Sequence, residues 1–345
     1  MSSVLQKYFP MIRTREAILQ EITTTPDLYS AFQKWDKDQQ DAFLAYCTGQ
    51  KGLHILHDPV FKEILNPELS PGRVEELLSL ILGEHIKILH ILPLESPRIG
   101  DEHSLIVMDL VVKLETGSIV NIEVQKLGYR FPGQRSACYS ADLLLRQYKR
   151  MRNEKSKSFS YKDIKKVYTI VLYEKSTSEF HQFPENYIHR FSQQSDTGIS
   201  IDLLQEYVFI PLDIFYRILH NKGIRNQLEA WLTFLSTDEP EMIEKLILSY
   251  PQFRCYYEEI YTLCQNTERV MDMFSKELQE LDKNTVQYMI DEMQEEIDAQ
   301  KETIDKQELL LNEKEQSLIT SQKTIKEQEE EIQKLKELLN ELSSR

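Results

Sequence analysis

Three polar side chains interrupt two apolar segments in the first third of the chain, at Asp109, Glu123 and Gln125. The segments are rich in Val, Ile and Leu and are separated by Gly117, a pattern typical of a β-hairpin. Burying a carboxylate without a partner is costly, so such residues persist in an apolar hairpin when they pair with a cation or bind a metal ion. We therefore expect chemistry at these three positions.

The register of this hairpin decides whether the two carboxylates can meet. Side chains alternate along a strand, so Glu123 and Gln125 point to one face. Asp109 points to the same face only if the residue numbers of paired residues add up to an even number, as when Asp109 lies opposite Glu123 or Gln125. This register requires an odd-length turn or a bulge, and a three-residue loop over residues 116–118, with Gly117 in a left-handed conformation, provides it. A two-residue turn would place the carboxylates on opposite faces.

Two carboxylates a few ångströms apart repel each other and stay ionised only around a cation. Oxygen ligands with open positions suit Mg²⁺, with Mn²⁺ as a substitute, because the ion keeps several waters and binds phosphate oxygens. Asp109 and Glu123 are therefore candidate metal ligands for phosphate-ester hydrolysis, and Gln125 could orient water or polarise a phosphate. The alternative is a partly exposed hairpin with ordinary surface carboxylates.

A basic segment follows the hairpin directly. Residues 124–166 contain 12 Lys and Arg against 3 Asp and Glu, a local net charge of +9 in a chain whose net charge is −15. A helix is predicted over residues 133–152. The residues on one face of this helix, at spacings of three or four, are Arg135, Tyr139, Asp142, Arg146 and Arg150. This face could bind phosphates without reading bases. Alternatively, it is a solvated face, or some of its arginines pair with Asp142.

The elements that must position these residues are both helices and strands. Apolar residues at helical spacing predict helices through residues 1–50. Another helix is predicted to start at Pro71 and to end at Gly83. The predicted strand segments outside the hairpin are residues 87–92, 166–173 and 207–212. The last of these is predicted to be an edge strand because it contains Pro211, and only helices are expected after it.

The end of the chain has a different pattern. Apolar residues recur every seven positions, at Ile290, Ile297, Ile304, Leu311, Leu318, Ile325, Ile332 and Leu339. Gly and Pro do not interrupt this repeat, which predicts a left-handed coiled coil about 75 Å long. Five of the eight companion positions, three residues further on, are polar. The tail is therefore predicted to associate with copies of itself over residues 290–342, most firmly at its ends, and the number of chains stays open.

Length and composition limit the remaining possibilities. A chain of 345 residues exceeds one average domain. The N-terminus lacks an apolar signal segment, and no later run approaches about 18 apolar residues, so we expect a cytoplasmic protein without membrane spans. The four cysteines are widely spaced, and no Cys or carboxylate completes a ligand set with His54 and His57, so buried thiols and ordinary histidines are expected rather than a zinc site.

Several of these segments together resemble the PD-(D/E)XK nuclease superfamily. The similarity is to its branch of PD-(D/E)XK nuclease family transposases, which is related to the recombination-promoting (Rpn) nucleases. The resemblance spans roughly residues 40–290 and centres on Asp109 and on Glu123-Val-Gln125. The other segments that agree, in order along the chain, are residues 58–62, 64–67, 92–95, 108–112, 129–139 and 146–150.

The resemblance implies a restriction-endonuclease-like fold in which Asp109 and Glu123 bind the metal ion and Gln125 completes the catalytic set. Gln125 stands where most of the superfamily has Lys, a departure that this branch shares, and Met108 occupies the usual Pro position. Superfamily members often add an acid from a helix, and the candidates are Glu75, Glu76 and Glu84. The residues that would contact nucleic-acid phosphates are Arg135, Arg146, Gln147 and Arg150.

The first functional hypothesis is a Mg²⁺-dependent DNA endonuclease linked to transposition or recombination, with little sequence readout. The second is a catalytically weak or inactive relative that serves as an oligomeric scaffold for DNA or protein, because Gln125 removes a cation. A third is a structural coiled-coil protein with an α/β cap.

The predicted fold is α/β, with a central mixed sheet flanked by helices, helical additions at both ends and a C-terminal coiled coil. The predicted regions are an N-terminal helical region (1–53), a nuclease-like core (54–215), a helical region (216–284) and a coiled-coil tail (285–345).

Overall fold

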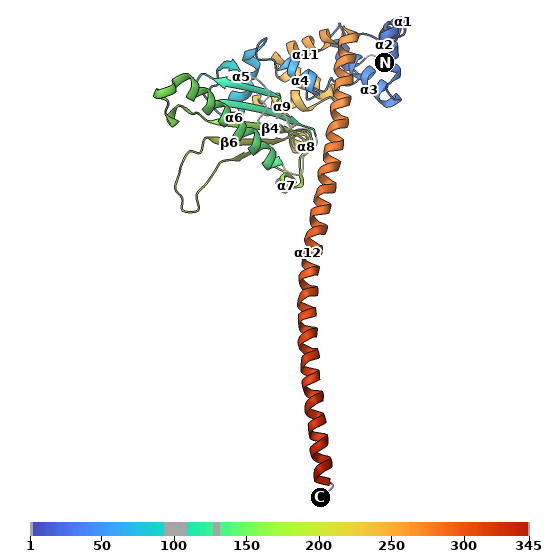
Figure 1. Cartoon of the computed structure of the whole chain (residues 1–345). Coiled ribbons are helices and arrows are strands. Elements are labelled where there is room, and N and C mark those ends of the chain that lie inside the picture. Colours follow the sequence, from blue (N-terminus) through green and yellow to red (C-terminus); the bar gives the residue numbers. More distant parts are fainter. Residues whose placement is uncertain (1–2, 93–108, 127–131, 344–345) are drawn as a thin grey trace. The chain divides into compact units, whose positions relative to one another are not determined.

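The computed structural model describes residues 3–92, 109–126 and 132–343 (Figure 1). The strands are β1 (Ile88–Ile91), β2 (Leu110–Leu114), β3 (Ile119–Gln125), β4 (Val167–Tyr173), β5 (His189–Phe191) and β6 (Gln205–Pro211). The α-helices are α1 (Arg15–Thr24), α2 (Pro26–Gln33), α3 (Lys37–Cys47), α4 (Asp58–Ile64), α5 (Pro71–Leu82), α6 (Pro132–Lys155), α7 (Ser178–His181), α8 (Leu212–Lys222), α9 (Gln227–Ser236), α10 (Pro240–Ser249), α11 (Gln252–Leu263) and α12 (Thr267–Ser343). The short 3-10 helices are η1 (Val4–Lys7), η2 (Ser156–Ser158) and η3 (Tyr161–Asp163).

The described strands form one six-stranded mixed sheet in the order β1-β2-β3-β4-β6-β5. The first three strands pair in antiparallel fashion, β4 joins β3 and β6 joins β4 in parallel, and β5 closes the sheet as an antiparallel edge. Parallel neighbours need a long crossover, and α6 lies in the crossover from β3 to β4. The predicted central mixed sheet with flanking helices is therefore confirmed.

The prediction that residues 207–212 form an edge strand is wrong. Strand β6 lies between β4 and β5, and the short β5 was not predicted. Pro211 is tolerated in this inner strand because β5 pairs only with residues 207–209 of β6. Pro211 thus lies beyond the part of the strand that has a neighbour on that side.

Local signals fix the helices that precede the sheet. Helix α5 begins at Pro71 and is capped by Gly83, whose φ of 77° is left-handed, as the sequence predicted. Helix α4 begins with Asp58 and has a proline in its first turn, where the missing N–H costs nothing. Asp58 and Lys62 lie four residues apart and therefore share one face of this short helix.

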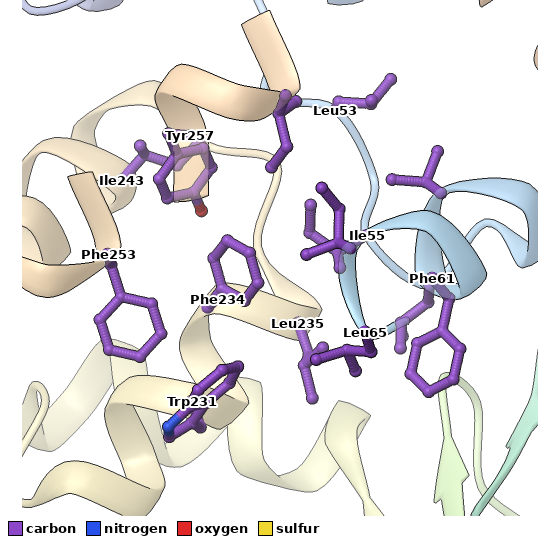
Figure 2. Close-up of a cluster of buried hydrophobic side chains, with 14 of the residues drawn as sticks. Leu53, Ile55, Phe61, Leu65, Trp231, Phe234, Leu235, Ile243, Phe253 and Tyr257 are labelled. Atoms are coloured by element: carbon purple, nitrogen blue, oxygen red, sulfur yellow. The ribbon is translucent and has the colours of Figure 1, made fainter. Parts of the chain in front are cut away.

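One face of the sheet is apolar and belongs to the main core. Its residues are Leu110, Val112, Val120, Ile122, Ile170, Leu172, Val208 and Ile210. The same core contains side chains from the N-terminal helices, from α4 and α5, from α8 to α11, and from the first turns of α12. Figure 2 shows part of it, with Phe61 of α4 in the same cluster as side chains of α9, α10 and α11. The sheet and the helices at both ends of the sequence are therefore packed around a shared core.

Residues 1–286 form one compact unit, and residues 287–345 form a second. The first unit contains the sheet, the helices before it and the helices after it. The second consists of the remainder of α12, so the predicted helical tail is confirmed as a helix. No helix in the described parts of the chain is both long enough and apolar enough to cross a membrane.

Candidate functional site

The hairpin of β2 and β3 has the register that brings Asp109 opposite Glu123. Leu110 pairs with Ile122, and every other residue pair between the two strands keeps the same even sum of residue numbers. The loop spans residues 115–117, between Leu114 and Ser118, and Gly117 is left-handed with a φ of 88°. The predicted three-residue loop is therefore present, although it starts one residue earlier than expected. Asp109 and Glu123 consequently lie on the same face of the sheet.

The two carboxylates are fixed by reciprocal hydrogen bonds across the strands. The amide of Val124 donates to Oδ2 of Asp109 at 2.6 Å, and the amide of Asp109 donates to Oε1 of Glu123 at 3.4 Å. Each carboxylate therefore contacts the backbone of the opposite strand. The Glu123 side chain is buried and Asp109 is half-buried. This arrangement holds the pair close together with little rotational freedom.

Burial is the main cause that raises the pKa of the Asp109 carboxyl to about 6. The amide of Val124 opposes this increase, the carboxylate of Asp58 adds to it, and the cations of Lys62 and Arg135 oppose it. Charged groups from α4 and α6 thus lie within electrostatic reach of Asp109.

Burial also raises the pKa of Glu123 well above its usual value, and the neighbouring Asp109 raises it further. The side chain of Asn121 and the guanidinium of Arg135 act in the opposite direction. The two carboxyl groups destabilise each other's charged forms. At neutral pH they therefore favour any cation that can lie between them.

Helix α4 supplies a carboxylate and an ammonium group that were not predicted as parts of the site. Asp58 holds Nζ of Lys62 with both carboxylate oxygens, at 2.8 and 3.0 Å. Burial acts to lower the pKa of Lys62, but its bond to Asp58 and the charges of Asp58, Asp109 and Glu123 outweigh that effect and raise the pKa. The only sequence signal was the segment at residues 58–62, which agreed with the family without a role being assigned.

A buried ion pair ties α4 to the end of β3. Lys126 follows Gln125 directly, and its ammonium forms an ion pair with Glu277 of α12. The two side chains are only 7% and 1% exposed. The other carboxylate oxygen of Glu277 accepts a hydrogen bond from the amide of Asp58 at 3.0 Å. Glu277 therefore joins the start of α4, the end of β3 and the first turns of α12.

Gln125 lies on the same face of β3 as Glu123 and is almost fully buried. Neither polar atom of its amide has a hydrogen-bond partner among the described residues, and the same holds for the hydroxyls of Thr169 and Tyr173 on the neighbouring strand. Buried polar groups are normally satisfied by protein or water. These side chains form a polar strip within the sheet face that packs against α6, and the strip is chemically suited to water or a polar ligand.

The basic helix is present as α6, but its predicted phosphate-binding residues divide into two groups. Arg135 acts electrostatically on Asp109 and Glu123, and its guanidinium lies over the Tyr139 ring at 5.2 Å. Arg146 instead forms an ion pair with Asp142 at 2.6 Å, an alternative that the sequence had left open.

The amide of Gln147 is used inside the protein. Its Oε1 accepts from the amide of Lys165 at 2.5 Å, and its Nε2 donates to the carbonyl of Lys165 at 3.1 Å. Gln147 therefore fixes the segment that leads into β4. Arg150, further along α6, is half-buried.

The acids considered on α5 hold other parts of the fold. Glu75 accepts hydrogen bonds from Lys87 and from the amide of Ile88, and Glu76 accepts one from Gln227. Glu84 is exposed beyond the end of the helix. The helical acid that acts on Asp109 is instead Asp58 of α4. Met108 lies outside the described residues.

The donor set fits a hard divalent cation. Among the described residues, no group of three His, Cys, Asp or Glu side chains is arranged to hold a metal ion. Mg²⁺, however, is commonly bound through only one or two protein carboxylates, with waters and phosphate oxygens as its other ligands. Two mutually destabilised carboxylates, Asp109 and Glu123, match that requirement.

The mixed sheet, with helices packed on both faces and a carboxylate pair in its antiparallel hairpin, defines an α/β protein of the restriction-endonuclease-like class. A family profile described as PD-(D/E)XK nuclease family transposase matches residues 55–292. The chain belongs to this family, which confirms the resemblance seen in the sequence. Searches of curated proteins and of solved structures gave no match.

Proposed function

We propose that the chain is a metal-dependent DNA endonuclease that acts in transposition or recombination and cleaves with little sequence readout. The observation that carries this proposal is the reciprocally bonded pair of Asp109 and Glu123, whose charged forms destabilise each other. Such a pair is poorly suited to a purely structural role, because two hydrophobic residues would stabilise the hairpin better. Membership of a nuclease and transposase family supports the same function.

Asp109 and Glu123 would hold Mg²⁺, with Mn²⁺ as a substitute. When bound, the ion would neutralise charge on the phosphate and make a bound water more acidic. The amide of Gln125, which has no partner among the described residues, would orient water or a phosphate oxygen on the same face. Arg135 and Arg150 would contact the DNA backbone, since their guanidinium groups bind phosphates without reading base sequence.

Supercoiled plasmid provides the test of this function. Purified protein is expected to nick it with Mg²⁺ or Mn²⁺ and not in the presence of a chelator. Asp109→Ala should abolish nicking, because half of the carboxylate pair is lost. The exposed Asp196 provides a matched control, and Asp196→Ala should nick at the parental rate. A parent that does not respond to metal, or an Asp109→Ala variant that nicks as well as the parent, contradicts the proposal.

A scaffold with little or no catalytic activity is the second candidate, and Gln125 is the observation that favours it. A neutral amide stands where a cation would stabilise charge during cleavage. A protein of this kind would bind plasmid in the presence of Ca²⁺ but would leave it intact with Mg²⁺ and Mn²⁺.

We further propose that the tail associates with copies of itself. In the single chain, the seven-residue repeat leaves Ile297, Ile304, Leu311, Leu318 and Ile325 between 54% and 61% exposed along one helix. A sustained apolar seam of this kind is typical of helices that pair with a second copy. The polar companion positions limit the stability of the seam.

Removing the chain after residue 284 is expected to reduce the molar mass measured by light scattering to that of a single chain. A sharper test keeps the full length. Leu311→Lys with Leu318→Lys places charges on the seam and should dissociate the assembly, because buried charges in a coiled-coil seam are costly. Leu309→Lys with Gln316→Lys has the same spacing on the opposite side of the helix, and it should leave the mass unchanged. Equal masses for the two double variants would refute the proposed seam.

A further inference from the structure

The cation missing from position 125 is not supplied by the next residue in the chain. Lys126 follows Gln125 just beyond the end of β3, and continued alternation along the strand would direct it to the face opposite Glu123. Its charge is also neutralised by the buried carboxylate of Glu277. A phosphate beside Asp109 and Glu123 would therefore need a cation from another element.

Helix α4 brings such a cation to the end of β3. The amide of Asp58 bonds to the same Glu277 carboxylate that holds Lys126, so the first turn of α4 lies next to the end of the strand. Lys62 lies one helical turn further on, on the same face as Asp58. Phe61, between them in the sequence, is fully buried in the main core and anchors the helix in this position (Figure 2).

The ammonium of Lys62 is held and directed by its neighbours. Both oxygens of Asp58 contact Nζ, and the Asp109 and Glu123 carboxylates lie within electrostatic reach of it. An ammonium group has three donors, so the two bonds to Asp58 leave one N–H for another acceptor. The Lys62 side chain is 37% exposed, and its end can therefore be reached by a ligand from solvent.

We propose that Lys62 is the catalytic cation of this site, donating a hydrogen bond to the phosphate that is cleaved in place of the lysine missing at position 125. This inference rests on the proposed nuclease function. Asp58 acts as the positioning residue that fixes Lys62. The charge on the phosphate grows as the water attacks, and a fixed ammonium beside it stabilises that charge more than the starting phosphate.

Lys62→Met is expected to lower the single-turnover rate of plasmid nicking by about a hundredfold, as for the loss of one electrostatic donor. Binding of a DNA duplex in Ca²⁺ should change much less than the rate. Lys62→Arg should keep most of the activity because it retains the charge. The decisive variant combines Lys62→Met with Gln125→Lys, which restores an ammonium on the β3 face beside Glu123 and should recover much of the lost rate.

Lys276→Met provides a matched control, because Lys276 also forms an ion pair with an aspartate four residues earlier, on the exposed side of α12. It should nick at the parental rate. If the parent is active and Asp109→Ala is not, but Lys62→Met equals the parent or is not rescued by Gln125→Lys, the role of Lys62 is overturned while the nuclease function stands. An inactive parent overturns both. If Gln125→Lys lowers the melting temperature, Lys62→Arg decides: near-parental activity supports the proposal, and a rate as low as that of Lys62→Met overturns it.

Discussion

Glu123→Gln is expected to slow the proposed Mg²⁺-dependent nicking by about a thousandfold, because the loss of a proposed metal ligand should cost the transition state about 4 kcal/mol. The same substitution should raise the melting temperature of the metal-free protein. The Glu123 carboxylate is buried beside Asp109 and destabilised there, whereas a glutamine of the same shape carries no charge. Loss of activity and gain of stability from a single atom replacement are the signature of a site built for a cation.

The stability that Glu123→Gln gains over the parent should increase with pH. Because the pKa of Glu123 is higher in the folded protein than in the unfolded chain, stability is greatest below the unfolded pKa and falls as the pH rises through the folded pKa. Asp109, with a pKa of about 6, acts in the same direction. The difference in melting temperature between Glu123→Gln and the parent should therefore be largest near about pH 8 and shrink toward about pH 5.

Differential scanning fluorimetry checks both expectations. Mg²⁺ at about pH 8 should stabilise the parent and leave Glu123→Gln unchanged, because a ligand stabilises only the protein that binds it. Glu115→Gln, in the exposed turn of the same hairpin, is the matched control and should follow the parent throughout. A metal-free Glu123→Gln variant that is less stable than the parent at every pH would show that the carboxylate has a structural role instead.

Glu277→Ala is expected to destabilise the first unit by about 3–5 kcal/mol, because it leaves the ammonium of Lys126 buried without a partner. The substitution also removes the acceptor of the Asp58 amide. Lys126→Met with Glu277→Gln should recover most of this loss, since the double variant has no buried charge and keeps an oxygen for the Asp58 amide. Urea unfolding of the single and double variants measures both effects.

The exposed pair of Asp272 and Lys276 lies on the same helix and provides the control for this experiment. Asp272→Ala should change the unfolding free energy little, because surface ion pairs contribute little. If Glu277→Ala were as mild as Asp272→Ala, the Lys126 ammonium would have to reach water in the folded protein, contrary to its 7% exposure.

The half of the candidate site that lies within the hairpin could be predicted from the sequence. Alternation along β3 and the odd loop at Gly117 determine that Asp109 and Glu123 share a face, and both are local properties of the chain. Helix α6 was predicted for the same reason, since its periodicity and charge are local. Their residue types suggested a metal site for phosphate-ester hydrolysis, and the family resemblance pointed to the same chemistry.

The half that could not be predicted depends on contacts between distant residues. Asp58 and Lys62 reach the hairpin only because α4 packs into the main core, and no local pattern shows which face of α4 meets the sheet. The family resemblance suggested that Gln147 contacts phosphate, but its partner is a backbone group eighteen residues away, which no local pattern predicts. Likewise, the family resemblance made Glu75 a candidate catalytic acid, but its carboxylate accepts a hydrogen bond from the amide of Ile88 in β1.

The bond between Glu277 and Lys126 also has a consequence for the order in which the protein is made. Lys126 and Asp58 leave the ribosome long before Glu277, which follows Lys126 by 151 residues. Until then the ammonium of Lys126 has no buried counter-charge, and the start of α4 is not tied to the end of β3. A nascent chain that stops before residue 277 would thus carry both hairpin carboxylates without the contact that holds α4 beside them. Assembly of the candidate site is in this way delayed until the helix that continues into the tail is being synthesised.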